Sequence, residues 1–271
     1  MALTPDIPED MRALIDDRLT AIEQNERAHI LFAVESGSRA WGFPSPDSDF
    51  DVRFVYVRDK DWYLSIDQRR DVIELPIEGD LDINGWDLKK ALQLLVKPNP
   101  VLLEWLRSPV VYRADRNAMK KITALGEKTA HQRPSSYHYL HLAESQYRRF
   151  IADEKEVKLK KYFYSLRPAL ALMWLRNHAE KPVPMNLAEL RAGVMLPNKV
   201  SDFLDELLKK KAKTKELGAG PRHAALDALI EQEIDAAKSA IGELPVPRAE
   251  LIEEANTLFR DLVHDDLVLG D

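Results

Sequence analysis

Two aspartates near the N-terminal end have the type and spacing of metal ligands. Asp49 and Asp51 lie two residues apart in DFDVRFVYV (49–57), whose apolar alternation predicts a strand. Side chains two residues apart on a strand share a face, and two close carboxylates repel unless a cation compensates them. The pair therefore predicts a site for an oxygen-preferring divalent cation such as Mg²⁺.

A glycine and a serine precede this pair and could hold a phosphate. Gly37-Ser38 closes the short apolar run ILFAVES (30–36), a second predicted strand. Glycine lets the backbone approach a ligand closely, and a serine hydroxyl with nearby N–H groups can hold a phosphate oxygen. Either segment alone is common. Their order, strand, Gly-Ser, loop, Asp-x-Asp, predicts a phosphate-and-metal site, whereas two solvated surface aspartates would not explain acids within an apolar strand.

A third carboxylate would complete a two-metal site and could accept a proton from an attacking hydroxyl. Asp82 in DLDIN (80–84) is the best candidate, because its apolar neighbours should face the other side of the strand. Asp80, nearer the turn, is the alternative. Two arginines are further candidates: Arg39 lies beside Gly37-Ser38 and could contact phosphate, and Arg53 could pair with an aspartate.

A helix predicted over residues 157–178 carries a second group of candidates. Lys160, Tyr164 and Arg167 fall on one face of this helix, and Lys161 is adjacent. Cations and a phenol together could hold the β- and γ-phosphates and the base of a nucleotide. The alternative is that these side chains only cover the outer face of the helix.

The predicted elements fall into two regions. Besides the two strands above, 71–77 and 80–84 read as a hairpin, while 8–25, 86–97 and 99–108 read as helices. No strand is predicted after residue 115, where the helices are 115–130, 135–153, 157–178, 198–213, 222–241 and 247–267. We therefore predict an α+β fold with a small mixed β-sheet domain at 1–112 and an all-α domain at 113–271.

Composition limits the classes of function. The chain has 271 residues, of which 45% are hydrophobic and 31% charged, as in globular proteins. The absence of cysteine excludes disulfides and thiolate metal sites, and the net charge of −6 gives no support to a general duplex-binding protein. No apolar run is long enough to span a membrane, and the acidic start MALTPDIPED is unlike a signal peptide, so a cytoplasmic location is expected.

These motifs resemble a known superfamily. Gly37-Ser38 followed by Asp49-Phe50-Asp51 resembles the signature of the DNA polymerase β-like nucleotidyltransferases. The phrases SRAWGFPSPDSDFDVRFVYV, NGWDLKKALQLLVKPNPVLLEWLRSPVVY and KKYFYSLRPALALMWLRN are similar to RlaP-type predicted nucleotidyltransferases associated with RNA repair. This narrower resemblance covers most of the chain up to about residue 180.

The resemblance implies a fold and a reaction. The fold is a small mixed sheet backed by helices, with the active site on the sheet. The reaction is attack of an acceptor hydroxyl on the α-phosphate of a nucleoside triphosphate, ATP being favoured. Gly37 and Ser38 would hold the triphosphate, Asp49 and Asp51 would bind two Mg²⁺ ions (or Mn²⁺), and Asp82 would bind the catalytic ion and act as or position the base.

The sequence leaves the acceptor open. It could be an RNA end, a small molecule, or a protein hydroxyl, as in an AMPylating transferase. A non-catalytic nucleotide-sensing module is the other class, against which the intact acids argue. The oligomeric state is open as well.

Overall fold

The computed structural model describes residues 7–97, 99–129, 132–178, 181–215, 217–240, 242 and 248–264. They form two compact units. The sheet unit comprises the described residues of Thr4–Ala40, Asp49–Thr129 and Pro247–Asp271. The helical unit comprises those of Trp41–Ser48 and Ala130–Val246. The chain therefore leaves the sheet unit between the Gly-Ser and Asp-x-Asp segments and returns at Asp49.

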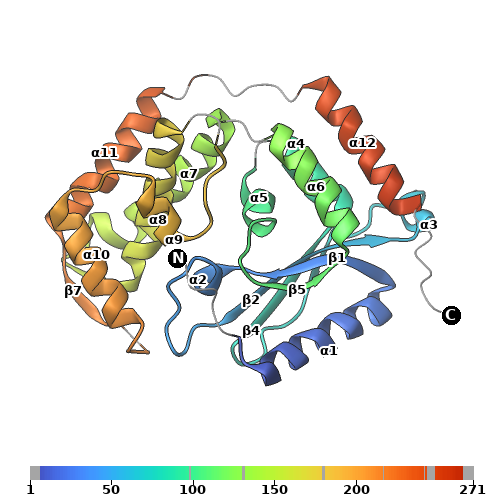
Figure 1. The fold of residues 1–271 in the computed structure, drawn as a ribbon, viewed down its shortest axis with the longest axis horizontal. Helices are drawn as coiled ribbons and strands as arrows, with labels where there is room; N and C mark the ends of the chain where they lie inside the picture. The colour runs from blue at the N-terminus through green and yellow to red at the C-terminus, as the bar shows by residue number, and fades with distance from the viewer. Residues whose placement is uncertain are drawn as a thin grey trace. The chain divides into compact units, whose positions relative to one another are not determined.

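A five-stranded sheet in the order β3-β4-β2-β1-β5 forms the centre of the sheet unit (Figure 1). β2 and β4 are parallel, and the other neighbouring strands are antiparallel. The strands are β1 (Ala28–Glu35), β2 (Phe50–Arg58), β3 (Val72–Glu74), β4 (Leu81–Asp87) and β5 (Val111–Ala114).

The alternation of β2 sorts its side chains onto two faces. Phe50, Val52 and Phe54 belong to a core that includes residues of α1 (Glu9–Glu26). Val55 and Val57 belong to a second core formed with the helices on the other face, α4 (Leu88–Val96), α5 (Val101–Trp105), α6 (Arg116–Thr129) and α12 (Ala249–His264) (Figure 1). Asp51 and Arg53 share the parity of Val55 and Val57, so they point to the α4 side.

The helical unit packs around the buried helix α8 (Lys160–Asn177). A second, two-stranded sheet pairs β6 with β7. The loop segment Trp41–Ser48 joins this core: the Phe43 ring stacks on Phe163 with centroids 4.7 Å apart, and the Trp41 carbonyl accepts a hydrogen bond from the Leu187 N–H. The remaining elements are α7 (Gln132–Tyr147), the π-helical turn η1 (Arg148–Ala152), β6 (Glu156–Lys158), α9 (Leu187–Ala192), α10 (Asn198–Lys211), β7 (Ala219–Pro221) and α11 (Ala224–Ala240).

The predicted fold class is confirmed: a mixed sheet with helices is followed by a mainly helical region. Three details of the prediction are wrong. β5 was not expected, and β6 and β7 lie in the region predicted to be free of strands, because strands of three or four residues carry too little alternation to be recognised. The helix predicted at 86–97 begins at Leu88, since β4 continues through Asp87.

The two units differ from the contiguous ranges 1–112 and 113–271. α6 and α12 pack with the sheet, and Trp41–Ser48 packs with the helices. An amphipathic helix has the same local pattern whichever core it covers, so composition gives no sign of this exchange. Residues 1–6, 130, 241, 247 and 265–267, which fall in predicted segments, lie outside the described residues.

Among the helices that the structure describes, none combines the length and apolar character needed to cross a bilayer.

In the short connecting segments of the sheet unit, two further helical turns occur. These are α2 (Gly37–Ala40), which contains the predicted Gly-Ser motif, and α3 (Lys60–Tyr63).

Candidate active site

The parallel pairing of β2 with β4 places Asp51 directly opposite Asp82. Arg53, two residues further along β2, lies between the two carboxylates. One of its guanidinium nitrogens, Nη2, is 2.7 Å from Asp82 Oδ2 and 3.1 Å from Asp51 Oδ1. The interpretation of Arg53 as an ion-pair partner of an aspartate is thereby confirmed. The three side chains are 19% to 31% exposed, so the group is accessible to a ligand.

Asp80 and Asp82 differ clearly in position. Asp80 lies in the turn before β4. Its carbonyl accepts a hydrogen bond from the Phe50 N–H at 2.7 Å, at the point where the pairing of β2 with β4 begins. Asp82 stands in register with Asp51, while its neighbours Leu81 and Ile83 are buried on the opposite face. The structure thus places Asp82 opposite Asp51. We call these two residues the acid pair.

Asp49 does not share the strand with Asp51, contrary to prediction. The ladder begins at Phe50, so Asp49 lies just before β2 and is exposed. Its carbonyl accepts a hydrogen bond from Arg39 Nε at 3.2 Å, and the Arg39 guanidinium lies 3.9 Å from the centroid of the Phe50 ring. Asp49 remains close enough for its charge to act on Asp51.

The electrostatics of Asp51 are those of a carboxylate that needs a cation. Burial raises the pKa of Asp51, and the charges of Asp82 and Asp49 raise it further, against the lowering effect of Arg53. The available donors are carboxylate oxygens, which fit a hard divalent ion. As the side chains stand, no group of three acidic or histidine residues in the described chain is arranged to hold a metal ion. Arg53 contacts one oxygen of each carboxylate, so a metal ion bound at those two oxygens would have to displace its guanidinium.

The backbone of Gly37 lies directly against the Asp51 carboxylate. Its φ is +57°, and a Cβ at this position would lie 1.8 Å from Asp51 Oδ2. The Ser36 N–H donates to the Asp51 carbonyl at 2.8 Å, which joins the two motifs through the backbone. Ser38 follows in α2. Glycine is therefore required at residue 37 both by the backbone conformation and by the closeness of the carboxylate.

Glu35 is a functional candidate that the sequence analysis missed. It ends β1 and is fully buried. Its Oε1 accepts the Asp51 N–H at 3.0 Å, and its other oxygen accepts the hydroxyl of Tyr112. Burial raises the pKa of Glu35 to about 7. The available signal was an acid at the end of the apolar run ILFAVES, directly before the Gly-Ser motif.

The four candidates on α8 belong to the helical unit and differ in exposure. Tyr164 is 39% exposed, and Lys160 and Lys161 are partly exposed. Arg167 is only 3% exposed; its guanidinium donates to the Met185 carbonyl and lies 4.8 Å from the Trp41 ring. Arg167 thus packs inside the unit, while the other three reach its surface.

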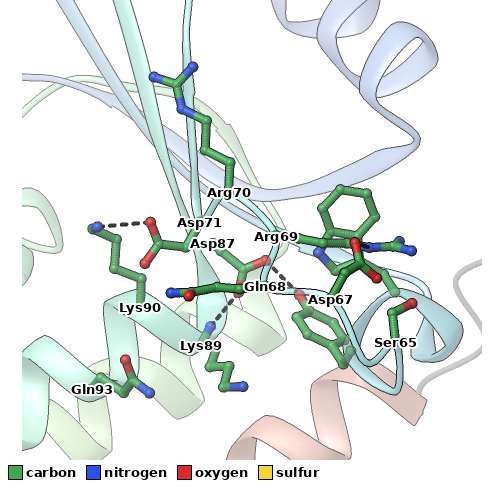
Figure 2. Close-up of a pocket in the computed structure, with 12 residues that line it drawn as sticks. Ser65, Asp67, Gln68, Arg69, Arg70, Asp71, Asp87, Lys89, Lys90 and Gln93 are labelled. Atoms are coloured by element: carbon green, nitrogen blue, oxygen red, sulfur yellow. Dashed lines mark hydrogen bonds and ion pairs between the residues drawn. The ribbon is translucent and has the colours of Figure 1, made fainter.

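A cavity of about 270 Å³ lies beside Asp87 at the carboxyl end of β4 (Figure 2). Asp87, the last residue of β4, lines it and caps α4. Other charges in its wall pair with one another, Lys90 with Asp71 and Arg69 with Asp67, each at 3.0 Å. None of the predicted site residues lines this cavity.

Comparisons with known proteins agree with the motifs. The model of the family RlaP, described as "RNA repair pathway DNA polymerase beta family", matches residues 11–261. A Bacillus subtilis (strain 168) protein described as "Uncharacterized protein YcgL" is 41% identical over 255 residues, which are 94% of this chain and 97% of the relative. A crystal structure of a nucleotidyltransferase-like protein from Exiguobacterium sibiricum 255-15 matches 92% of this chain and 79% of its own, with 10% identity and a TM-score of 0.29. The family match spans both the acid pair and α8.

Proposed function

Because this chain belongs to the RNA repair pathway DNA polymerase β family, we propose that it transfers a nucleoside monophosphate from a nucleoside triphosphate to an acceptor hydroxyl. The observation that carries the proposal is the register of two parallel strands. It sets Asp51 opposite Asp82, with Gly37 against the Asp51 carboxylate. Two carboxylates beside a glycine turn suit a substrate that brings both phosphate and metal.

The proposed reaction is an in-line displacement. The acceptor oxygen forms a bond to the α-phosphorus, the bond from that phosphorus to the bridging oxygen breaks, and pyrophosphate leaves. The proton of the acceptor hydroxyl passes to a carboxylate, for which Asp82 is the candidate because it is the more exposed of the register pair. Glu35 fixes the Asp51 backbone through its hydrogen bond and so positions the acid pair.

Asp51, Asp82 and Asp49 would hold Mg²⁺, with Mn²⁺ as a substitute. When bound, two such ions neutralise the developing charge and lower the pKa of the attacking hydroxyl. The chain's own part is to keep the carboxylates together. Arg53 does so before the ions arrive, since its guanidinium contacts both Asp51 and Asp82.

Each unit carries its own candidates for contacts with the phosphates of the nucleotide. In the sheet unit these are Gly37, Ser38 and Arg39 of α2, where a Cβ at Gly37 would meet the Asp51 carboxylate. Lys160, Lys161 and Tyr164 are the surface candidates on α8, whereas the role of Arg167 is to hold the Trp41 segment within the helical unit.

We propose ATP as the favoured donor and an RNA end as the acceptor. The support for RNA is the description of the family; the net charge of −6 favours a short RNA end over a long strand. A protein hydroxyl as acceptor is an outcome that the following experiment distinguishes.

The test is transfer of label from each α-³²P-labelled nucleoside triphosphate in the presence of Mg²⁺, with and without short RNAs. We expect label in RNA that disappears with EDTA. Asp51→Asn and Asp82→Asn should each lower transfer by at least about 10³-fold, because a group that holds a catalytic metal supplies several kcal/mol at the transition state.

Asp80→Asn is the matched control, an exposed aspartate two residues from Asp82 that should leave the rate almost unchanged. Label in protein instead of RNA would replace the acceptor but keep the reaction. Tight nucleotide binding with no turnover on any acceptor would overturn the proposal.

A further inference from the structure

A cluster of four cations lies around the start of α8. Arg149 comes from the π-helical turn η1, Lys158 from β6, and Lys160 and Lys161 from the first turn of α8. The charges are close enough to act on one another: burial lowers the pKa of Lys161, and Lys160, Arg149 and Lys158 lower it further. We call these four residues the cation cluster.

Two members of the cation cluster lie close to the same aromatic ring. The Lys161 ammonium is 4.0 Å from the centroid of the Phe150 ring, and the Arg149 guanidinium is 5.0 Å from the same centroid. Lys161 also lies 5.2 Å from the ring of Tyr164, which is 39% exposed. The rings hold the cations by cation–π attraction without removing their charge.

Three of the four residues of the cation cluster have no carboxylate partner in the described part of the chain. These three are Arg149, Lys158 and Lys161. The neighbouring Arg148 is different, since its guanidinium pairs with Glu144 at 2.7 Å. Gathering like charges costs free energy, and that cost is recovered when an anion of high charge density binds.

Irregular backbone produces this arrangement. The π-helical turn follows directly after α7. Such turns are rare in proteins, and those that do occur are frequently found at functional sites. β6 is fixed by its pairing with β7, in which Lys158 stands opposite Ala219, while the adjacent Val157 is buried. The exposed cations are thus presented from elements that the core holds in place.

We propose that the cation cluster, with Phe150 and Tyr164, binds the phosphate groups of a ligand. The phosphates would belong either to the triphosphate of a nucleotide or to the backbone of a single-stranded RNA. The inference extends the proposed function, on which the choice of these two ligands rests, by adding Arg149, Lys158 and Phe150 to the α8 residues. Its test measures binding alone, so it succeeds or fails independently of nucleotidyl transfer.

The experiment compares binding of three probes, a short fluorescent single-stranded RNA, ATP and inorganic tripolyphosphate, to the full-length chain at several salt concentrations. Arg149→Ala and Lys158→Ala should each weaken binding of at least one probe roughly 10-fold, as expected for loss of a charged hydrogen bond. For RNA, each substitution should also reduce the salt slope by about 1.

The matched controls are the neighbouring cations Arg148→Ala and Lys155→Ala, both exposed and outside the cation cluster. They should change binding less than about 2-fold, which is the effect of a screened surface charge. Circular dichroism would establish that each variant is folded, and Phe150→Leu provides a variant that keeps every charge and should weaken binding less than Arg149→Ala.

The pattern of losses identifies the ligand. Weaker binding of ATP and tripolyphosphate with unchanged RNA binding would assign the cation cluster to the triphosphate, and the reverse would assign it to the strand. Equal effects of Arg149→Ala and Arg148→Ala on all probes, or no measurable binding of any probe to the unaltered chain at low salt, would overturn the proposal.

Discussion

The acid pair of the sheet unit and the cation cluster of the helical unit differ in whether their like charges are paired with opposite charges of the protein. Asp51 and Asp82 stand in register on two strands, and Arg53 contacts both, so the repulsion is offset inside the protein. The cation cluster draws on three elements and contains aromatic rings, with no carboxylate paired to Arg149, Lys158 or Lys161 in the described chain. The charges of the acid pair are thus compensated by a side chain of the protein, whereas those of Arg149, Lys158 and Lys161 are available to a bound anion.

The difference teaches how each site should respond to a ligand. A cation entering the acid pair must compete with Arg53, so its affinity is set by an exchange. An anion reaching the cation cluster displaces no carboxylate of the described chain from Arg149 or Lys158, so its affinity follows charge and salt directly. The predictions below concern the acid pair, beginning with the largest expected effect.

Gly37→Ala would break the acid pair by displacing one of its carboxylates. The new Cβ would lie 1.8 Å from Asp51 Oδ2, so the carboxylate has to move, and transfer should approach the loss of Asp51→Asn, about 10³-fold. Steady-state transfer and a thermal melt would be measured together.

Glycine is needed at residue 37 for its positive φ and for the closeness of Asp51, and Gly79→Ala tests the first reason without the second. Gly79 has a φ of +60°, close to that of Gly37, but its Cβ would meet nothing within 4 Å. It should therefore lose only about 1 kcal/mol of stability, from the left-handed conformation, and keep its activity. If the two variants were equally active, the contact with Asp51 would be unimportant.

Glu35 should make the stability of the protein fall as pH rises. The ordinary pKa of a glutamate is 4.5, whereas that of Glu35 in the folded protein is about 7, so the folded state holds the proton more tightly between these values. The stabilisation is complete below pH 4.5 and is lost as pH rises through 7. The loss should be about 3 kcal/mol.

Urea unfolding at a series of pH values, with EDTA present, would measure this dependence. Glu35→Gln keeps an acceptor for the Asp51 N–H but cannot ionise, so its stability should change less over the same range. An identical slope in both proteins would show that Glu35 does not titrate as proposed.

Arg53→Gln should leave the two carboxylates of the acid pair without a cation of the protein beside them, because it removes the guanidinium that contacts both. Without metal, the variant should be less stable by about 1 kcal/mol, since two partly exposed ion pairs are lost. Mg²⁺ should then raise its melting temperature more than that of the unaltered protein, because no guanidinium competes for the carboxylates.

Arg70→Gln serves as the control, since Arg70 pairs with Glu74 elsewhere in the same unit. Its melting temperature should respond to Mg²⁺ as the unaltered protein does. Equal responses of Arg53→Gln and Arg70→Gln would mean that Arg53 does not guard the acid pair.

The residues that could be predicted are those fixed by local pattern. The strand alternation put Asp51 and Asp82 each on a polar face, and the motif order tied Gly37 to Asp51. The register that sets the two acids opposite each other joins strands about thirty residues apart, which alternation does not define. The prediction placed Asp49 in the same strand as Asp51. The strand instead starts at Phe50, whose N–H donates a hydrogen bond to the Asp80 carbonyl.

Other features were missed because their sequence signal is weak or shared with ordinary elements. Glu35 ends an apolar run and reads as the strand's exposed end, yet it is fully buried between Tyr112 and the Asp51 N–H. Arg149 and Phe150 fall within a predicted ordinary helix, since a π-helical turn has the composition of the α-helix around it. The placement of α12 depends on contacts far apart in the chain.

The return of α12 to the sheet unit has a consequence for synthesis of the chain. A nascent chain leaves the ribosome from its N-terminus, so α1 and the five strands emerge before the main part of the helical unit, and α12 emerges after it. Leu92 and Leu95 of α4 share a core with Leu251 and Leu258 of α12, so part of that apolar surface stays uncovered until translation has passed residue 258. The unit that starts first on the ribosome is therefore the one that is completed last.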